Sequence, residues 1–369
     1  MISITSPTLL LDENKCRNNI KRISIKLEKN NISFRPHFKT HQSLKVGEWF
    51  KEKSIAAITV SSVKMAKHFA QAGWMDITIA FPVNIREIDE INKLGRTIKL
   101  GILVSDPQTV SRIITLVDTK INVWIEIDTG DHRSGFSLDN FEIIKETIEI
   151  LNSSDNIDVK GFLSHSGITY STSSTSEIEK LHNNSIVKLN QLRDYLTVFF
   201  PGLLISFGDT PSFSIVNKFQ NFDEGRPGNF VFYDMMQFQL GACSIDDIAV
   251  AMVCPVVAKY QERGEIIIYG GAVHFSKEYI IDKQNRKSFG RVVKLNSSGW
   301  VDSGDKNYLA GLSQEHGIVK LNNKMMKEVE VGDLIGILPI HSCLTASCMK
   351  GFLTLDGKSI DHLEGLNKY

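Results

Sequence analysis

The sequence predicts an α/β protein built as a (β/α)8 TIM barrel that is followed by a mostly β C-terminal domain. About eight short apolar runs rich in β-branched residues alternate with helically spaced segments over the first 235 residues. The runs lack strict apolar/polar alternation, which is typical of parallel strands buried on both faces. After residue 235, short strand candidates follow one another between Gly, Asn, Asp and Ser turns. A doubly wound open sheet is the main alternative for the first part.

The first barrel helix is expected after the N-cap Asp12, with Cys16, Ile20, Ile23 and Leu27 on one face. The barrel strands are expected, in chain order, at ISFRPHF (32–38), IAAITV (55–60), DITIAF (76–81), TIKLGILV (97–104), INVWIEI (121–127), VKGFLSH (159–165), LLISFG (203–208) and within 219–224. The later strands are expected in GEIIIYGGAVHF, SFGRVVKLN, GIVKLNN, EVEVGDLIGILPI and GFLTLDGKSI. We therefore predict a barrel domain over 13–235 and a β domain over 236–369 that also contains the segment 1–12, where SPTLLLD forms one more strand.

Composition excludes several classes of function. The chain of 369 residues has 42 basic and 42 acidic side chains, so its net charge gives no electrostatic basis for binding nucleic acid or an anionic membrane. The N-terminus resembles no signal peptide, and no apolar stretch reaches the roughly 18 residues of a membrane span. Five cysteines without a CxxC pair indicate a reducing compartment. We expect a cytoplasmic protein that acts on a small molecule.

The motif RPHFKTH (35–41) carries the densest chemical signal. If it continues the first strand, His37, Lys39 and His41 share one face at the strand's C-terminal end, where barrel enzymes place their active sites. Burial and neighbouring positive charge would lower the pKa of Lys39, and such a lysine can form a Schiff base with a carbonyl. The alternative is a solvated loop lysine beside two incidental histidines.

Two further loops could contact an anionic ligand. GDTPSF (208–213) follows a predicted strand and offers backbone N–H groups and hydroxyls to a phosphate, although the same composition is found in ordinary turns. In IEIDTGDHRSGF (125–136), Glu126 and Asp128 share a strand face ahead of Arg133. That arginine could contact a cofactor oxygen or simply form an ion pair with one of the acids.

A possible metal pair lies in ILPIHSCLTAS. In an extended segment His341 and Cys343 project to the same side, and imidazole with thiolate is a preferred zinc pair. Two protein ligands leave the site open to water or substrate. A buried histidine beside a small apolar thiol is the alternative.

Together these motifs resemble the D-threonine aldolase and D-serine dehydratase family, whose alanine racemase-like barrels (fold type III) use pyridoxal 5′-phosphate (PLP). The resemblance covers almost the whole chain: SPTLLLD, RPHFKTH, IEIDTGDHRSGF, GFLSHSGITY, SFGDTPSF, EGRPGNFVFYD and HSCLTAS. It implies that Lys39 forms the Schiff base with PLP and that Arg133 lies near the phenolic oxygen of the cofactor. It places Tyr170 with Lys39, His37 and His41 among the catalytic residues. The implied cofactor-binding set also contains His165, Ser206, Gly208, Asp209 and Thr210.

The resemblance also implies a function and a metal. His341 and Cys343 match a divalent metal pair, either zinc or manganese, and the His-x-Cys spacing is more similar to the dehydratases, because aldolases can carry aspartate as the second ligand. Ile168 stands where the family often has a histidine. We therefore expect a PLP-dependent, metal-assisted lyase for β-hydroxy D-amino acids, of the aldolase or dehydratase type, that forms a homodimer. A PLP-dependent racemase and a non-catalytic PLP-binding protein are the alternatives.

Overall fold

The computed structural model describes residues 4–365 and divides into two compact units. The barrel unit comprises Arg22–Lys39 and Phe50–Gly228, and the β unit comprises Met1–Lys21, Thr40–Trp49 and Asn229–Tyr369. The ends of the predicted β domain, 1–3 and 366–369, lie outside the described residues. None of the helices within 4–365 has the length and apolar composition that would let it cross a membrane.

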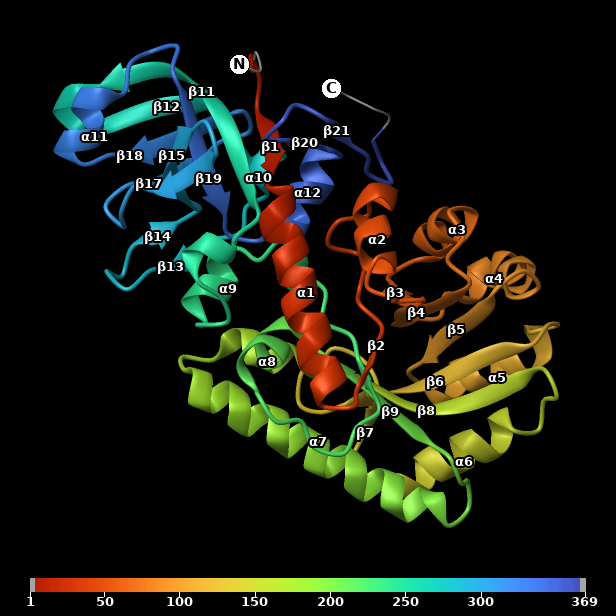
Figure 1. The fold of residues 1–369 in the computed structure, drawn as a ribbon. Coiled ribbons are helices and arrows are strands. Elements are labelled where there is room, and N and C mark those ends of the chain that lie inside the picture. Colours follow the sequence, from red (N-terminus) through yellow and green to blue (C-terminus); the bar gives the residue numbers. More distant parts are fainter. Residues whose placement is uncertain (1–3, 366–369) are drawn as a thin grey trace. The chain divides into compact units, whose positions relative to one another are not determined.

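Eight parallel strands form the barrel, as predicted (Figure 1). They run in the order β2-β10-β9-β8-β6-β5-β4-β3, and residues 36–38 return to β3 through hydrogen bonds between Phe38 N and Thr59 O and between Thr59 N and Pro36 O, each 2.9 Å. The strands are β2 (Ser33–Phe34), β3 (Ala57–Val60), β4 (Asp76–Pro82), β5 (Lys99–Val104), β6 (Ile121–Asp128), β8 (Ile157–His165), β9 (Leu204–Gly208) and β10 (Glu224–Gly225), with β7 (Phe136–Ser137) beside β6. The closed order excludes the doubly wound alternative.

A helix follows each barrel strand except the last, and most begin at a side-chain cap. Ser62, Asp106, Ser174 and Asp209 each accept a hydrogen bond from a backbone N–H in the first turn of their helix. The helices are α2 (Leu44–Lys51), α3 (Val63–Gln71), α4 (Ile88–Gly95), α5 (Pro107–Leu116), α6 (Phe141–Leu151), α7 (Thr175–Thr197) and α8 (Thr210–Ile215). This alternation is the (β/α)8 pattern expected from the sequence.

Helix α1 (Glu13–Lys29) matches its prediction. Asp12 caps it through Lys15 N at 3.1 Å, and the predicted apolar face is at most 1% exposed at Cys16, Ile20, Ile23 and Leu27. The apolar spacing therefore identified the buried face correctly.

Antiparallel strands make up most of the β unit. Six of them close a ring in the order β12-β18-β17-β15-β19-β11, because β11 pairs with both β19 and β12. The strands of the ten-stranded sheet are β1 (Thr8–Leu11), β11 (Val250–Tyr260), β12 (Glu265–Tyr269), β15 (Gly290–Asn296), β16 (Gly299–Asp302), β17 (Tyr308–Leu312), β18 (His316–Lys320), β19 (Leu334–Pro339), β20 (Phe352–Thr354) and β21 (Ser359–Ile360). A separate hairpin pairs β13 (Ile280–Ile281) with β14 (Lys287–Ser288), and the helices are α9 (Met235–Gln239), α10 (Ala272–Phe275), α11 (Asn323–Glu328) and α12 (Ser342–Met349). The N-terminal strand β1 pairs with β11 and β20.

Candidate active site

The segment that carries Lys39 is a turn rather than a strand. Strand β2 ends at Phe34, His37 makes a single bridge to β3, and residues 38–41 form a turn. The prediction that a continuous strand places His37, Lys39 and His41 on one face is therefore wrong, because the pairing that would sustain the alternation stops at His37. His41 is fully buried, whereas Lys39 is exposed.

A buried aromatic anchor holds this turn in the barrel unit. Phe38 is fully buried directly before Lys39. Its ring lies 4.9 to 5.1 Å from the ring centroids of Phe50, Phe69 and Trp74. Within the turn the Lys39 backbone N–H donates to His37 Nδ1 at 3.3 Å. The position of Lys39 thus depends on the packing of its neighbour.

His165, at the C-terminal end of β8, lies in the electrostatic field of the predicted site residues. Burial, together with the positive charges of Lys39 and Arg133, lowers the pKa of His165 to about 3. Its Nδ1 lies 2.6 Å from the Gly208 carbonyl oxygen, so the neutral ring donates there and leaves Nε2 as an acceptor. Tyr170 lies beside it, with ring centroids 6.2 Å apart. The structure therefore brings Lys39, Arg133 and His165 together at one end of the barrel.

The segments that follow β8 and β9 contain buried hydroxyls. Asp209 caps α8 by accepting from Ser212 N at 2.7 Å, and Tyr170 Oη accepts from Thr210 N at 3.3 Å. The hydroxyl oxygens of Ser166, Thr210 and Ser212 are buried and have no hydrogen-bond partner within residues 4–365. Since unpartnered buried polar atoms are costly, this group fits an anionic ligand such as a phosphate.

The barrel interior next to this loop is a charged network. Ser206 donates to Glu224 and accepts from Arg226 Nε, both at 2.7 Å. Arg35 donates to Glu224 and to Asp76, both at 2.6 Å. Burial lowers the pKa of Arg226 to about 10, against the negative charge of Glu224, so the guanidinium stays charged at neutral pH. The hydroxyl of Ser206 is therefore engaged inside the barrel.

Arg133 lies in the loop after β6 and is not held by either of the acids of that strand. Glu126 accepts from Ser134 Oγ at 3.0 Å, and Asp128 accepts from three backbone N–H groups of the following loop. The Arg133 side chain is 58% exposed, and its Nε lies 3.9 Å from Asp131 Oδ2. The two acids thus shape the loop and leave the guanidinium exposed for a ligand.

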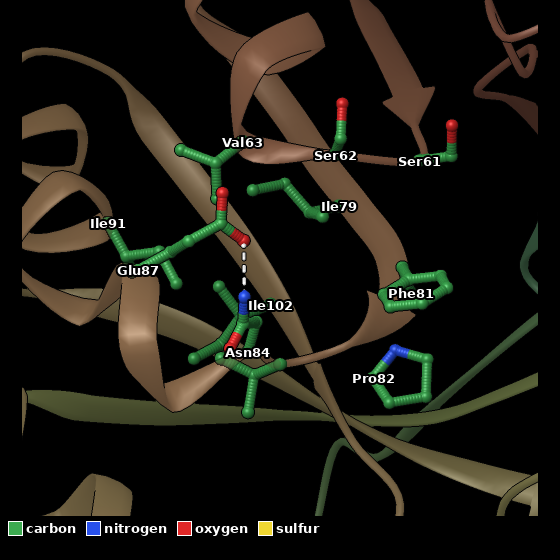
Figure 2. A pocket seen from close by; sticks show the side chains of 11 residues that line it. Ser61, Ser62, Val63, Ile79, Phe81, Pro82, Asn84, Glu87, Ile91 and Ile102 are labelled. Atoms are coloured by element: carbon green, nitrogen blue, oxygen red, sulfur yellow. Dashed lines mark hydrogen bonds between the residues drawn. The ribbon is translucent and has the colours of Figure 1, made fainter.

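A separate pocket of about 300 Å³ opens in the barrel unit (Figure 2). Asn84 donates to Glu87 at its edge at 3.2 Å, and Phe81 is 58% exposed. The lining residues are Ser61, Ser62, Val63, Ile79, Phe81, Pro82, Val83, Asn84, Glu87, Ile91 and Ile102. None of the predicted site residues lines this pocket.

The predicted metal pair lies at the start of a helix. His341 is the N-cap of α12 and Cys343 lies in its first turn, so the prediction of an extended HSC segment is wrong. The strand β19 ends at Pro339, and the apolar-polar pattern that follows belongs to a helix. Cys343 is buried, and the buried Nδ1 of His341 has no hydrogen-bond partner in the described chain.

These two side chains have the chemistry of an open metal site. Within residues 4–365 no group of three or more His, Cys, Asp or Glu side chains is arranged to hold a metal ion. His341 and Cys343 would then supply two ligands, and water or substrate the rest. Cys343 Sγ lies 3.2 Å from Oγ1 of Thr40, the residue that follows Lys39 in the chain.

Several polar residues at these sites were not singled out from the sequence. They are Ser166, Ser212, Glu224, Arg226, Asn229 and Asp234. The charged pair in EGRPGN, which follows the weakest strand signal, was the available indication of Arg226. The contact of Asp234 with the metal segment had no local signal, because Ser342 lies 108 residues further along the chain.

The comparisons with known proteins agree with this architecture. Residues 11–235 match the family model "Alanine racemase, N-terminal domain", and residues 249–355 match "Putative serine dehydratase domain". The chain is 25% identical to D-threo-3-hydroxyaspartate dehydratase of Delftia sp. strain HT23 over 96% of this chain and 95% of that protein. It is also 25% identical to D-serine dehydratase of Dictyostelium discoideum over 95% of this chain and 93% of that protein.

Solved structures give the same result. The Delftia enzyme superposes with a TM-score of 0.91 at 25% identity and covers 99% of both chains. A variant of D-threo-3-hydroxyaspartate dehydratase, described as metal-free, superposes with a TM-score of 0.91 over 99% of both chains at 24% identity. Alanine racemase from Corynebacterium glutamicum has a TM-score of 0.63 at 15% identity over 90% of both chains, which shows the fold alone. The chain therefore belongs to the family with an alanine racemase N-terminal domain, here joined to a D-serine dehydratase domain.

Proposed function

We propose that this protein is a PLP-dependent, divalent-metal-assisted lyase that removes water from a β-hydroxy D-amino acid. The observation that carries the proposal is a contact of the residue next to Lys39. Thr40, which directly follows Lys39 in the chain, contacts the thiol of Cys343, one of the two candidate metal ligands. The dehydratase relatives, which match over nearly their whole length, support the choice of an elimination.

The chain offers a suitable set of groups for PLP. The unpartnered hydroxyls of Ser166, Thr210 and Ser212 would hold the phosphate, and Gly208 and Asp209 would shape that loop. When bound, PLP would stabilise negative charge at Cα of an amino acid. Ser206 would act indirectly, by holding Arg226 in place.

The side chains around Lys39 have distinct tasks in this proposal. Lys39 Nζ would bind PLP as a Schiff base and later remove the proton from Cα. His165 would remain neutral, since its pKa of about 3 lies well below physiological pH, and would contact the cofactor as a ring. Arg133 would attract the phenolic oxygen. His37, His41 and Tyr170 would complete the catalytic set.

The metal would assist the departure of the β-hydroxyl. Nitrogen and sulfur donors favour zinc over manganese, so His341 and Cys343 point to zinc. Held by these two residues, the metal would supply a Lewis acid for the departure of the hydroxyl group. Loss of the Cα proton and hydroxide gives an enamine, and hydrolysis of that enamine yields a 2-oxo acid and ammonia.

Product analysis tests the proposal. The purified protein would be incubated with D-serine, D-threonine and D-threo-3-hydroxyaspartate, with and without a chelator. Ammonia and a 2-oxo acid, lost on chelation, support the dehydratase. Glycine and an aldehyde would instead identify an aldolase, an inverted enantiomer a racemase, and bound PLP with no product a non-catalytic PLP protein.

We also propose that the protein acts as a homodimer, as the resemblance implies. Light scattering coupled to gel filtration would test this, with a mass near twice the 41.4 kDa of one chain expected.

A further inference from the structure

A buried carboxylate in the β unit accepts hydrogen bonds from the segment that carries the candidate metal pair. Asp234 is fully buried, and no ion pair to it occurs in the described part of the chain. Four hydrogen bonds compensate for its burial, all from neutral donors. One comes from Gln237 N to Oδ1 at 3.0 Å, where Asp234 caps α9.

The other three bonds link Asp234 to the metal segment. Its Oδ2 accepts from Ser342 N at 2.9 Å and from Ser342 Oγ at 3.2 Å, and Ser342 lies between His341 and Cys343. The same oxygen accepts from Asn229 Nδ2 at 2.6 Å. That amide nitrogen also lies 3.5 Å from Cys343 Sγ.

We propose that Asp234 is a positioning residue for the metal site. Through Ser342 it fixes the backbone between the two ligands, and through Asn229 it orients a donor toward the sulfur of Cys343. The inference rests on the proposed role of His341 and Cys343 as metal ligands. Residues that orient metal ligands typically contribute 10- to 100-fold to affinity.

Capping of α9 alone does not account for this arrangement. A helix cap needs one acceptor, which a neutral serine or asparagine supplies at lower burial cost. Asp234 instead directs three of its four hydrogen bonds away from the helix that it caps. Both of its oxygens face donors only, so an asparagine in either orientation would place an NH2 group against an N–H donor.

The test is zinc affinity rather than activity. Asp234→Asn would be compared with wild type in the PLP-loaded protein, after removal of metal, by competition between the protein and a chromophoric chelator for Zn²⁺. We expect zinc binding to weaken 10- to 100-fold while the cofactor absorbance stays unchanged. Asp106→Asn is the matched control, since Asp106 caps α5 in the barrel unit, and its zinc affinity should equal that of wild type.

The outcomes separate this inference from the proposed function. If wild type binds zinc and Asp234→Asn binds it equally well, the positioning role is wrong and the metal site stands. If wild type binds no zinc, both the positioning role of Asp234 and the proposed metal site are wrong. Should Asp234→Asn fail to fold, Ser342→Ala decides, because it removes the hydrogen bonds of the hydroxyl group, which donates to Asp234 and accepts from Asn229, and keeps the backbone N–H bond to Asp234. A weakening of zinc binding by about 3- to 10-fold supports the inference, and unchanged affinity overturns it.

Discussion

Replacing Asp209 with asparagine should stabilise the cofactor-free protein more at alkaline than at acidic pH. Asp209 is 2% exposed and accepts from Ser212 N at 2.7 Å and Thr169 Oγ1 at 3.1 Å, whereas its Oδ2 has no partner among the described residues. Burial raises the pKa of this carboxyl from 3.8 to about 6. Asparagine keeps the oxygen that caps α8 and carries no charge.

The sign and size of this pH dependence follow from the linkage between proton binding and folding. Between pH 4 and 6 the folded protein binds more protons at Asp209 than the unfolded chain, so the folded state loses stability as pH rises through this range. The loss approaches about 3 kcal/mol above pH 7, of which about 1.4 kcal/mol develops between pH 5 and pH 8.

Urea denaturation of wild type and Asp209→Asn at these two pH values measures the effect. The stability difference in favour of the variant should grow by about 1 to 2 kcal/mol from pH 5 to pH 8. A difference that is independent of pH would refute the reasoning, because it would mean that Asp209 has the same pKa in the folded and unfolded states.

Three further predictions concern the barrel unit. Burial lowers the pKa of His182 to about 4, so the free energy of unfolding of wild type should fall by about 2 kcal/mol relative to His182→Leu when the pH falls from 7 to 5. An equal dependence of stability on pH in the two proteins would disprove this. A Cβ on Gly208 would lie 2.8 Å from the carbonyl carbon of Arg226, so Gly208→Ala should lower both the melting temperature and the affinity for PLP, and unchanged values in thermal melts and PLP titrations would count against the close packing. Arg35→Met removes the direct ion-pair partner of the buried Glu224 and should lower the free energy of unfolding, measured by urea denaturation, by about 3 to 5 kcal/mol. A loss below about 1 kcal/mol would show that other groups or water compensate the carboxylate.

Local sequence patterns predicted the barrel. Apolar runs between turns located seven of the eight strands, because burial on both faces leaves a continuous apolar signal. The eighth strand, β10, overlaps its expected range of 219–224 only at Glu224. The chain reversals after β6, β8 and β9 then place Arg133, His165 and Gly208 at the C-terminal end of the barrel, as expected for this fold.

The remaining features could not be predicted from the sequence, because they depend on contacts between residues far apart in the chain. Cys343 lies in the first turn of α12, whose N-terminal residue Ser342 is held by Asp234. Asp234 lies 108 residues before Ser342 in the chain, so no short window of sequence contains both partners. Arg226 follows a strand of two residues, too short to show a period. In both places a polar side chain is buried because it forms hydrogen bonds with a residue that is distant in the sequence.

Reduction with borohydride followed by peptide mass spectrometry tests the central claim most directly. The account predicts that the protein purified with PLP carries a reduced phosphopyridoxyl group on Lys39 after treatment. An unmodified Lys39, or a group attached to another lysine, would contradict it.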